Sequence, residues 1–151
     1  MHIVVNGVQQ DIESGPLTPL LEVLREELGV LSPKAGCQQG GCGTCTVLVD
    51  GEPRRACLTA VGAIAGSEVT TIEGLAGPDE LHPVQQAFHD HYAAQCGFCS
   101  PGMMLATVAL LDRTPSPSRE DIVDALRGHV CRCTGYVKIL DAVESLAGGA
   151  R

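Results

Sequence analysis

The nine residues CQQGGCGTC, 37–45, constrain the fold of this chain more than any other stretch, because they contain three cysteines and three glycines. Such a loop has almost no apolar side chains with which to join a hydrophobic core. Glycine can adopt positive φ angles and can bring the backbone close to neighbouring atoms without a Cβ clash. The sequence therefore predicts a loop that folds around a metal group held by its cysteines, with backbone N–H groups turned towards the sulfurs.

The cysteine spacing within this loop is typical of an iron–sulfur site. Cys37, Cys42 and Cys45 follow the C-x4-C-x2-C pattern of plant-type [2Fe–2S] clusters, which take four thiolates in all. A hairpin predicted around Gly51 has its centre midway between Cys45 and Cys57. Both cysteines would then lie at its open end, so Cys57 is predicted to be the fourth ligand.

Two alternatives for this group are weaker. A structural zinc site usually takes paired C-x2–4-C spacings, whereas three of these cysteines crowd into one loop. A redox pair of thioredoxin type, formed by Cys42 and Cys45, needs a helix start near a βαβ unit, but β-branched residues follow Cys45. The spacing favours an iron–sulfur cluster over both.

A second group of cysteines lies in QCGFCSPG and HVCRCTGY and comprises Cys96, Cys99, Cys131 and Cys133. A C-x-x-C pair followed by a C-x-C pair supplies four thiolates, which zinc would accept as well as an iron–sulfur cluster. Cys96 and Cys99 also imitate a thioredoxin-like motif, although no βαβ pattern surrounds them. On spacing alone, this site stays open between iron–sulfur and zinc.

The five histidines are interpreted as surface or packing residues. His89 and His91 are two residues apart on a predicted helix, so they point in different directions. His2 and His82 have no cysteine or acidic cluster beside them, and His129 adjoins a group that already offers four thiolates. None of the five is predicted to bind metal.

Composition and charge exclude several classes of protein. The start MHIVVNGVQQ lacks the basic segment and apolar run of a secretory signal, and no run approaches the roughly 18 residues of a membrane span. A cytoplasmic location is expected, where clustered cysteines are more often metal ligands or redox groups than disulfides. The net charge of −8 and the pI near 4.9 argue against a nucleic-acid partner, which would need patches of Lys and Arg.

The chain is predicted to divide into two halves at GLAGPDELHP, 74–83, which is rich in glycine and proline. Residues 1–77 are expected to form a strand-rich domain and residues 78–151 a helical domain, which gives an α+β fold. Aromatic residues make up only 3% of the chain. Two half-sized cores of this kind need staples such as metals or disulfides.

In the first half, the Asn-Gly pair at 6–7 predicts a hairpin, because its turn places both residues at positive φ. A helix is predicted with Thr18 as N-cap, Pro19 at the first helical position and Gly29 as the stop. A second hairpin around the Asp-Gly pair at 50–51 and a strand in SEVTTIEGL complete a small mixed sheet crossed by one helix.

In the second half, helices are predicted over 84–94 and 102–112, from Ser118 onwards, and over 136–146. Four short helices suggest a bundle. The apolar stretch GMMLATVALL is expected to fill its core.

The order of the motifs resembles a known family. AGCQQGGCGTCTV, DG, ACL, TIEGL, QCGFCSPGM and CRCTGY follow one another, and the likeness runs from Ile3 to about Val143. Together they resemble the small iron–sulfur subunit of the molybdenum hydroxylases, the xanthine oxidase family, which includes carbon monoxide dehydrogenase, isoquinoline and nicotine dehydrogenases and aldehyde oxidoreductases. The resemblance implies a plant-ferredoxin-like β-grasp domain followed by a four-helix-bundle domain, each with one [2Fe–2S] cluster.

The resemblance also implies roles for individual residues. The distal cluster would take Cys37, Cys42, Cys45 and Cys57, and the proximal cluster Cys96, Cys99, Cys131 and Cys133. Gln95 and Cys133 are expected to contact the molybdopterin of a large subunit. Electrons would pass from molybdenum through both clusters to FAD on a medium subunit, so the chain would act in an oxidoreductase without transforming substrate itself. A heterotrimer, or a dimer of such heterotrimers, is expected, and the large subunit would choose the substrate.

One residue departs from the family pattern, since many relatives carry Asn where this chain has His129. A histidine there is expected to satisfy local backbone groups with one ring nitrogen, and a role in tuning the cluster potential is a hypothesis. Two other functions stay open. A free-standing two-cluster ferredoxin would leave Gln95 and CRCTGY unexplained, and a zinc-stapled interaction module would contain no iron.

Overall fold

The computed structural model describes residues 1–148, and its first half is a mixed five-stranded sheet. The strands are β1 (His2–Val5), β2 (Val8–Asp11), β3 (Thr46–Val49), β4 (Glu52–Arg55) and β5 (Glu68–Thr70). They lie in the order β2-β1-β5-β3-β4. β1 and β5 are parallel, whereas the other neighbours are antiparallel. The small mixed sheet predicted from the sequence is confirmed.

Both predicted hairpins are present. β1 pairs with β2 and β3 pairs with β4, with tight turns at 6–7 and 50–51. Asn6 and Gly7 have φ angles of 52° and 78°, and Asp50 and Gly51 have 51° and 81°. These are the positive values that a type I′ turn requires, which is why Asn-Gly and Asp-Gly pairs occupy the two turns.

The helix that crosses the sheet begins later than predicted. α1 (Leu20–Glu22) continues directly into a π-helical turn, Val23–Glu27, and its N-cap is Pro19 rather than Thr18. The assignment of Thr18 as N-cap was wrong because the chain before the helix is held extended by tertiary contacts. Pro19 forms a β-bridge with Ala60, and the Leu20 N–H donates to the Thr59 carbonyl.

The second half contains four helices: α2 (Pro83–Asp90), α3 (Ser100–Arg113), α4 (Arg119–Leu126) and α5 (Val137–Glu144). All four predicted helices are confirmed, with shifted ends. α2 ends before its predicted limit because Tyr92 has a left-handed φ of 52°. No helix among residues 1–148 is both long enough and apolar enough to cross a membrane.

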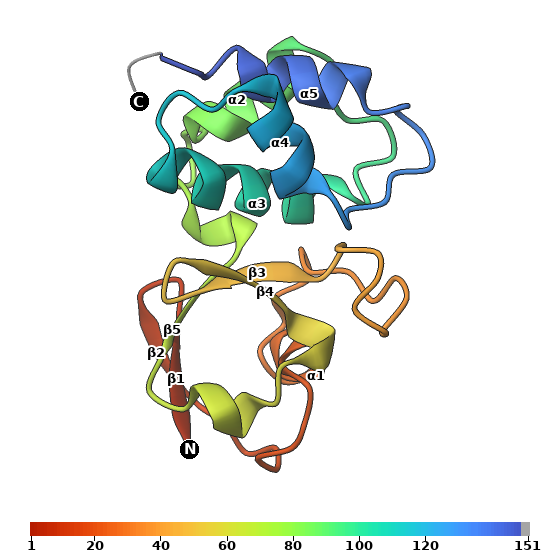
Figure 1. The fold of residues 1–151 in the computed structure, drawn as a ribbon. Coiled ribbons are helices and arrows are strands. Elements are labelled where there is room, and N and C mark those ends of the chain that lie inside the picture. The colour runs from red at the N-terminus through yellow and green to blue at the C-terminus, as the bar shows by residue number, and fades with distance from the viewer. Residues whose placement is uncertain (149–151) are drawn as a thin grey trace.

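The two halves share a packed face. β3 is buried along its whole length, with Val47 and Val49 in the core beneath the sheet and Leu48 in the core of the helices. α3, whose apolar residues fill the helical core as predicted, packs directly on β3. Figure 1 shows α3 over β3 and β4, with α1 on the other side of these strands.

Between the last strand and α2 the chain makes a short 3₁₀ turn, Ile72–Gly74, and then runs without regular structure to α2. The boundary expected near residue 78 falls in this irregular stretch. Of the helical domain expected over 78–151, residues 149–151 lie outside the described residues.

Candidate metal centres

The first group of thiols meets at the open end of the β3–β4 hairpin. Thr46 pairs with Arg55, and the Ala56 N–H donates to the Cys45 carbonyl at 3.3 Å, so the hairpin brings Cys57 back to Cys45. The Cys45 thiol interacts with those of Cys57 and Cys42, and the Cys37 thiol interacts with that of Cys42. All four thiols therefore lie close enough to interact.

Backbone N–H groups point at one of these sulfurs, as the glycine-rich loop predicts. The N–H groups of Gln39 and Cys42 each donate to Cys37 Sγ at 3.4 Å. The bond from Gln39, with that from Cys42, lowers the pKa of the Cys37 thiol to about 6. Burial instead raises the pKa of Cys45 to about 11. The group thus combines a thiolate-stabilising loop with a buried thiol beneath it.

At two glycines in or beside this loop, an added side chain would collide with neighbouring atoms. A Cβ on Gly36 would lie 2.6 Å from Thr44 Oγ1 and 2.9 Å from Cys42 Sγ. A Cβ on Gly43 would lie 2.6 Å from the ring of His129 and 2.8 Å from the Gly128 carbonyl oxygen. The loop is therefore packed closely against its own thiols and against the helical half.

The second group of thiols lies where α3 begins and in the loop before α5. Cys133 Sγ is 3.5 Å from Cys96 Sγ, and the Cys99 thiol contacts that of Cys131. Cys99 is buried at the N-cap of α3, and burial raises its pKa to about 12. Burial opposes ionisation of Cys131 too, but hydrogen bonds from Thr134 outweigh it and lower the Cys131 pKa to about 7.

Each group therefore presents four interacting thiols, and this arrangement fits a two-iron cluster. In a [2Fe–2S] cluster each iron takes two cysteine thiolates, whereas structural zinc draws four ligands onto one tetrahedron. The soft all-sulfur donor set and the N–H groups aimed at sulfur match an iron–sulfur group at both sites.

A hydrogen bond joins the two groups directly. The Val130 N–H donates to the Cys42 carbonyl at 2.9 Å. Val130 immediately precedes Cys131, so the bond links the backbone of a cysteine in the first group to the residue beside a cysteine in the second. The two candidate metal centres are therefore built on segments in direct contact.

His129 lies buried in the same contact, with 6% of its surface exposed. Its Nε2 is 3.0 Å from Thr46 Oγ1 and 3.2 Å from Arg55 Nη1, and Arg55 also donates to Thr46 and to the Gly128 carbonyl. Burial and the nearby Arg55 charge lower the pKa of His129 to about 4. Nε2 faces the side chains of β3 and β4, whereas a backbone hydrogen bond with Leu126 acts in the opposite direction and raises the pKa. Another histidine, His82, has a role that was not predicted. It is the N-cap of α2, and its ring accepts a hydrogen bond from the Val84 N–H.

The outer side of the second group is open. Gln95, Cys96 and Cys133 are all exposed, and Phe98 is 46% exposed. The Gln95 amide, expected to meet a pterin, is accessible to a molecule that approaches Cys96 and Cys133 from outside. The first group opens on Cys57, which lines a hollow of about 270 Å³ together with Gln38.

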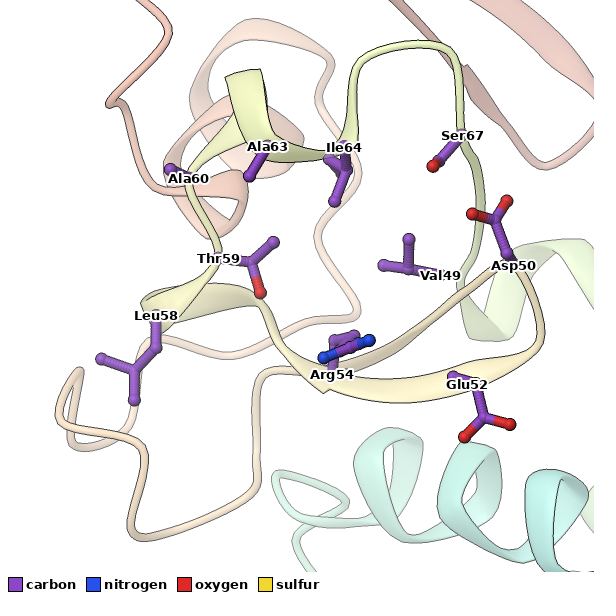
Figure 2. A pocket seen from close by; sticks show the side chains of 10 residues that line it. All are labelled: Val49, Asp50, Glu52, Arg54, Leu58, Thr59, Ala60, Ala63, Ile64 and Ser67. Carbon is purple, nitrogen blue, oxygen red and sulfur yellow. The ribbon is translucent and has the colours of Figure 1, made fainter.

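A larger hollow of about 570 Å³ lies between the β3–β4 hairpin and residues 58–67. Figure 2 shows Leu58 at one end of it and Asp50 and Ser67 at the other, with Arg54 between them. No cysteine lines it, so it is separate from both metal centres.

Sequence reasoning missed the residues that support the thiols. The hydroxyls of Thr44 and Thr134 reach Cys42 and Cys131, and the Tyr136 hydroxyl accepts from the Cys131 N–H at 2.8 Å. Thr44 stands between two cysteines, and Thr134 and Tyr136 belong to CRCTGY. A hydroxyl within a few residues of a predicted ligand cysteine was the available signal.

Comparison with known proteins gives the family. A model of the 2Fe-2S iron-sulfur cluster binding domain matches residues 3–67, and a model of the [2Fe-2S] binding domain matches residues 71–144. One of the subunits of nicotinate dehydrogenase from Pseudomonas putida is 48% identical over 147 residues, which cover 97% of this chain and 94% of that protein.

Two further relatives agree. Aldehyde oxidoreductase from Megalodesulfovibrio gigas is 47% identical over 148 residues, which cover 96% of this chain but only 16% of that much longer protein. The crystal structure of quinoline 2-oxidoreductase from Pseudomonas putida 86 superposes with a TM-score of 0.92 at 40% identity and covers 95% of this chain and 89% of that chain. With both [2Fe–2S] binding domains matched on an α+β fold of ferredoxin-like and helical halves, the chain belongs to the small iron–sulfur subunits of the molybdenum hydroxylase family.

Proposed function

We propose that the eight cysteines hold two [2Fe–2S] clusters, one in each half of the chain. The distal cluster takes Cys37, Cys42, Cys45 and Cys57, and the proximal cluster takes Cys96, Cys99, Cys131 and Cys133. Within each set the thiols interact in pairs that would hold the cluster from two sides: 37 with 42, 45 with 57, 96 with 133, and 99 with 131. Residues 1–77 and 78–151 serve as the two cluster-binding domains.

The function that this geometry supports best is electron relay within a molybdenum-containing oxidoreductase. The clusters supply one-electron transfer when they are bound. The chain supplies rigidity and a short separation, and the observation that carries the proposal is the hydrogen bond from Val130 N–H to the Cys42 carbonyl. Because this bond joins the two ligand segments directly, the two sets of thiols are held at a fixed distance.

The exposed sides of the two sites face different partners. The open side around Gln95, Cys96 and Cys133 receives a large subunit that carries molybdopterin, with Gln95 and Cys133 in contact with the pterin. The Cys57 side, where Leu58 is 65% exposed, receives a medium subunit that carries FAD. Both surfaces include apolar side chains that a partner would cover, so the chain is expected to work within a heterotrimer in the cytoplasm.

An iron count combined with low-temperature EPR of the dithionite-reduced protein tests this proposal. Two S = 1/2 signals and about four irons per chain are expected for two [2Fe–2S] clusters. Cys57→Ser should alter one signal and Cys131→Ser the other. Co-purification should bring down larger subunits that contain flavin and molybdenum. A colourless protein with stoichiometric zinc would contradict the proposed clusters. A chain that purifies with both clusters intact but without larger subunits would contradict the proposed partners.

A further inference from the structure

Each proposed cluster has one ligand cysteine that meets a threonine hydroxyl. Thr134 Oγ1 donates to Cys131 Sγ at 3.1 Å, and Thr44 Oγ1 lies 3.2 Å from Cys42 Sγ. A thiolate bound to iron carries no proton, so the hydroxyl must be the donor in both pairs. Hydrogen bonds to cluster sulfurs are one of the levers that set a reduction potential, because they stabilise the extra negative charge of the reduced state.

The hydroxyl proton of Thr134 is directed at sulfur alone. Its oxygen accepts from the Tyr136 N–H at 3.3 Å, which leaves the proton for Cys131 Sγ. The Thr134 N–H donates to the same sulfur at 3.4 Å. Tyr136 fixes this turn further, because its hydroxyl accepts from the Cys131 N–H. The loop therefore holds the Thr134 hydroxyl in one orientation.

The hydroxyl proton of Thr44 is shared between two acceptors. Besides the 3.2 Å contact with Cys42 Sγ, Thr44 Oγ1 lies 3.1 Å from the Lys34 carbonyl oxygen and can donate to it. The Lys34 N–H donates back to the Thr44 carbonyl at 2.9 Å, so the two residues are held together. Gly36 leaves the room for this arrangement, since a Cβ there would meet both the hydroxyl and the thiol.

We infer that Thr134 and Thr44 are positioning residues that raise the reduction potentials of the proximal and distal clusters by unequal amounts. The undivided bond of Thr134 raises the proximal potential more than the shared bond of Thr44 raises the distal one. This inference rests on the proposed function, because it places the clusters on the two sets of cysteines. Reduction adds one electron to a cluster and moves no proton, since each hydroxyl keeps its hydrogen.

An EPR-monitored redox titration of the intact complex tests the inference. Valine keeps the shape of threonine without its hydroxyl, so Thr134→Val and Thr44→Val remove one bond each. Thr134→Val should lower the reduced-to-oxidised ratio of one cluster about tenfold at a fixed solution potential, which is a shift of about 59 mV for a one-electron couple. Thr44→Val should shift the other signal in the same direction by less than half as much.

Two controls separate tuning from structure. Thr134→Ser and Thr44→Ser keep the hydroxyl and should restore the wild-type potentials. Pulsed EPR in D₂O should show a hydroxyl deuteron coupled to each cluster, and each valine variant should lose one such coupling. Unchanged potentials in both valine variants, an equal shift in both, or a serine variant that shifts as far as its valine counterpart would overturn the inference. Four irons and two signals retained in those same variants would leave the proposed function intact.

Discussion

Gly43 is a position at which a single methyl group should strongly disturb the contact between the two halves. It has a φ of +74°, and a Cβ there would lie 2.6 Å from His129 Cδ2 and 2.8 Å from the Gly128 carbonyl oxygen. Ordinary contacts begin at 3.4 Å, so the buried ring would have to move by several tenths of an ångström. Gly43→Ala therefore adds backbone strain to a steric overlap.

The expected cost can be divided between these two effects. An L-residue in the left-handed region costs about 1–2 kcal/mol. Overpacking a well-packed core costs about 1–3 kcal/mol. Together they predict a loss of about 2–5 kcal/mol, and at roughly 2–4 °C per kcal/mol for a chain of this size the melting temperature should fall by about 10 °C.

Two other glycines of the cysteine loops separate the contributions. Gly97 has a φ of +79° and open space around it, so Gly97→Ala should show the backbone strain alone. Gly41 has an ordinary φ and nothing within 4 Å of its would-be Cβ, so Gly41→Ala should be nearly neutral. Thermal unfolding of the iron-loaded complex, followed by loss of the cluster absorbance, ranks the three. The reasoning is refuted if Gly43→Ala unfolds at the same temperature as Gly97→Ala rather than at a lower one.

Three further changes should act at other places in the fold. Thr46→Val removes the buried hydroxyl between His129, Arg55 and the Gly43 carbonyl, and it should lower the free energy of unfolding in denaturant by about 1–3 kcal/mol. The control Thr107→Val loses only a hydrogen bond to the Met103 carbonyl of its own helix and should lower it less. Burial would raise the pKa of Glu73, but hydrogen bonds from Ser32 and Thr71 outweigh burial and lower that pKa below 4.5. The stability that these bonds contribute is therefore present above pH 4.5 and is lost as the pH falls through the lowered pKa. Hydrogen exchange of segment 31–34 should accordingly be faster in Glu73→Gln than in wild type at pH 7, with no difference in acid. Arg119→Met breaks an exposed network with Asp141 and Glu144, and its small effect on unfolding should vanish in high salt.

The elements that could be predicted from the sequence are those fixed by local chemistry. Asn-Gly and Asp-Gly turns require positive φ at both residues, and the structure has both turns where the sequence predicts them. Ser118 caps α4 through a reciprocal pair with Asp121, as its position before an acidic first turn predicts. The order of the motifs from AGCQQGGCGTCTV to CRCTGY likewise resembles the family that the comparisons show, whereas spacing alone left the second group open between iron–sulfur and zinc.

The features that sequence reasoning missed depend on contacts between distant residues. Thr18 has the chemistry of an N-cap, yet the bridge between Pro19 and Ala60 sets the start of α1 one residue later. The partners of His129 could not be predicted, because Thr46 and Arg55 lie 83 and 74 residues away in the chain. A local sequence pattern does not show which side chains will be buried by a part of the chain that is distant in sequence.

The packing of β3 explains why the two groups of cysteines are carried by segments that lie against each other. TVLV is apolar on both of its faces, and both faces are buried, since Val47 points into the core beneath the sheet while Leu48 joins the core of the helices. A strand covered on both sides fixes the helical half against the hairpin that carries Cys45 and Cys57. The bond from Val130 to Cys42 then follows from the packing of the core and needs no separate linker. Changes at this strand should therefore alter both metal sites together, whereas changes on the outer strand β2, which only β1 pairs with, should alter neither.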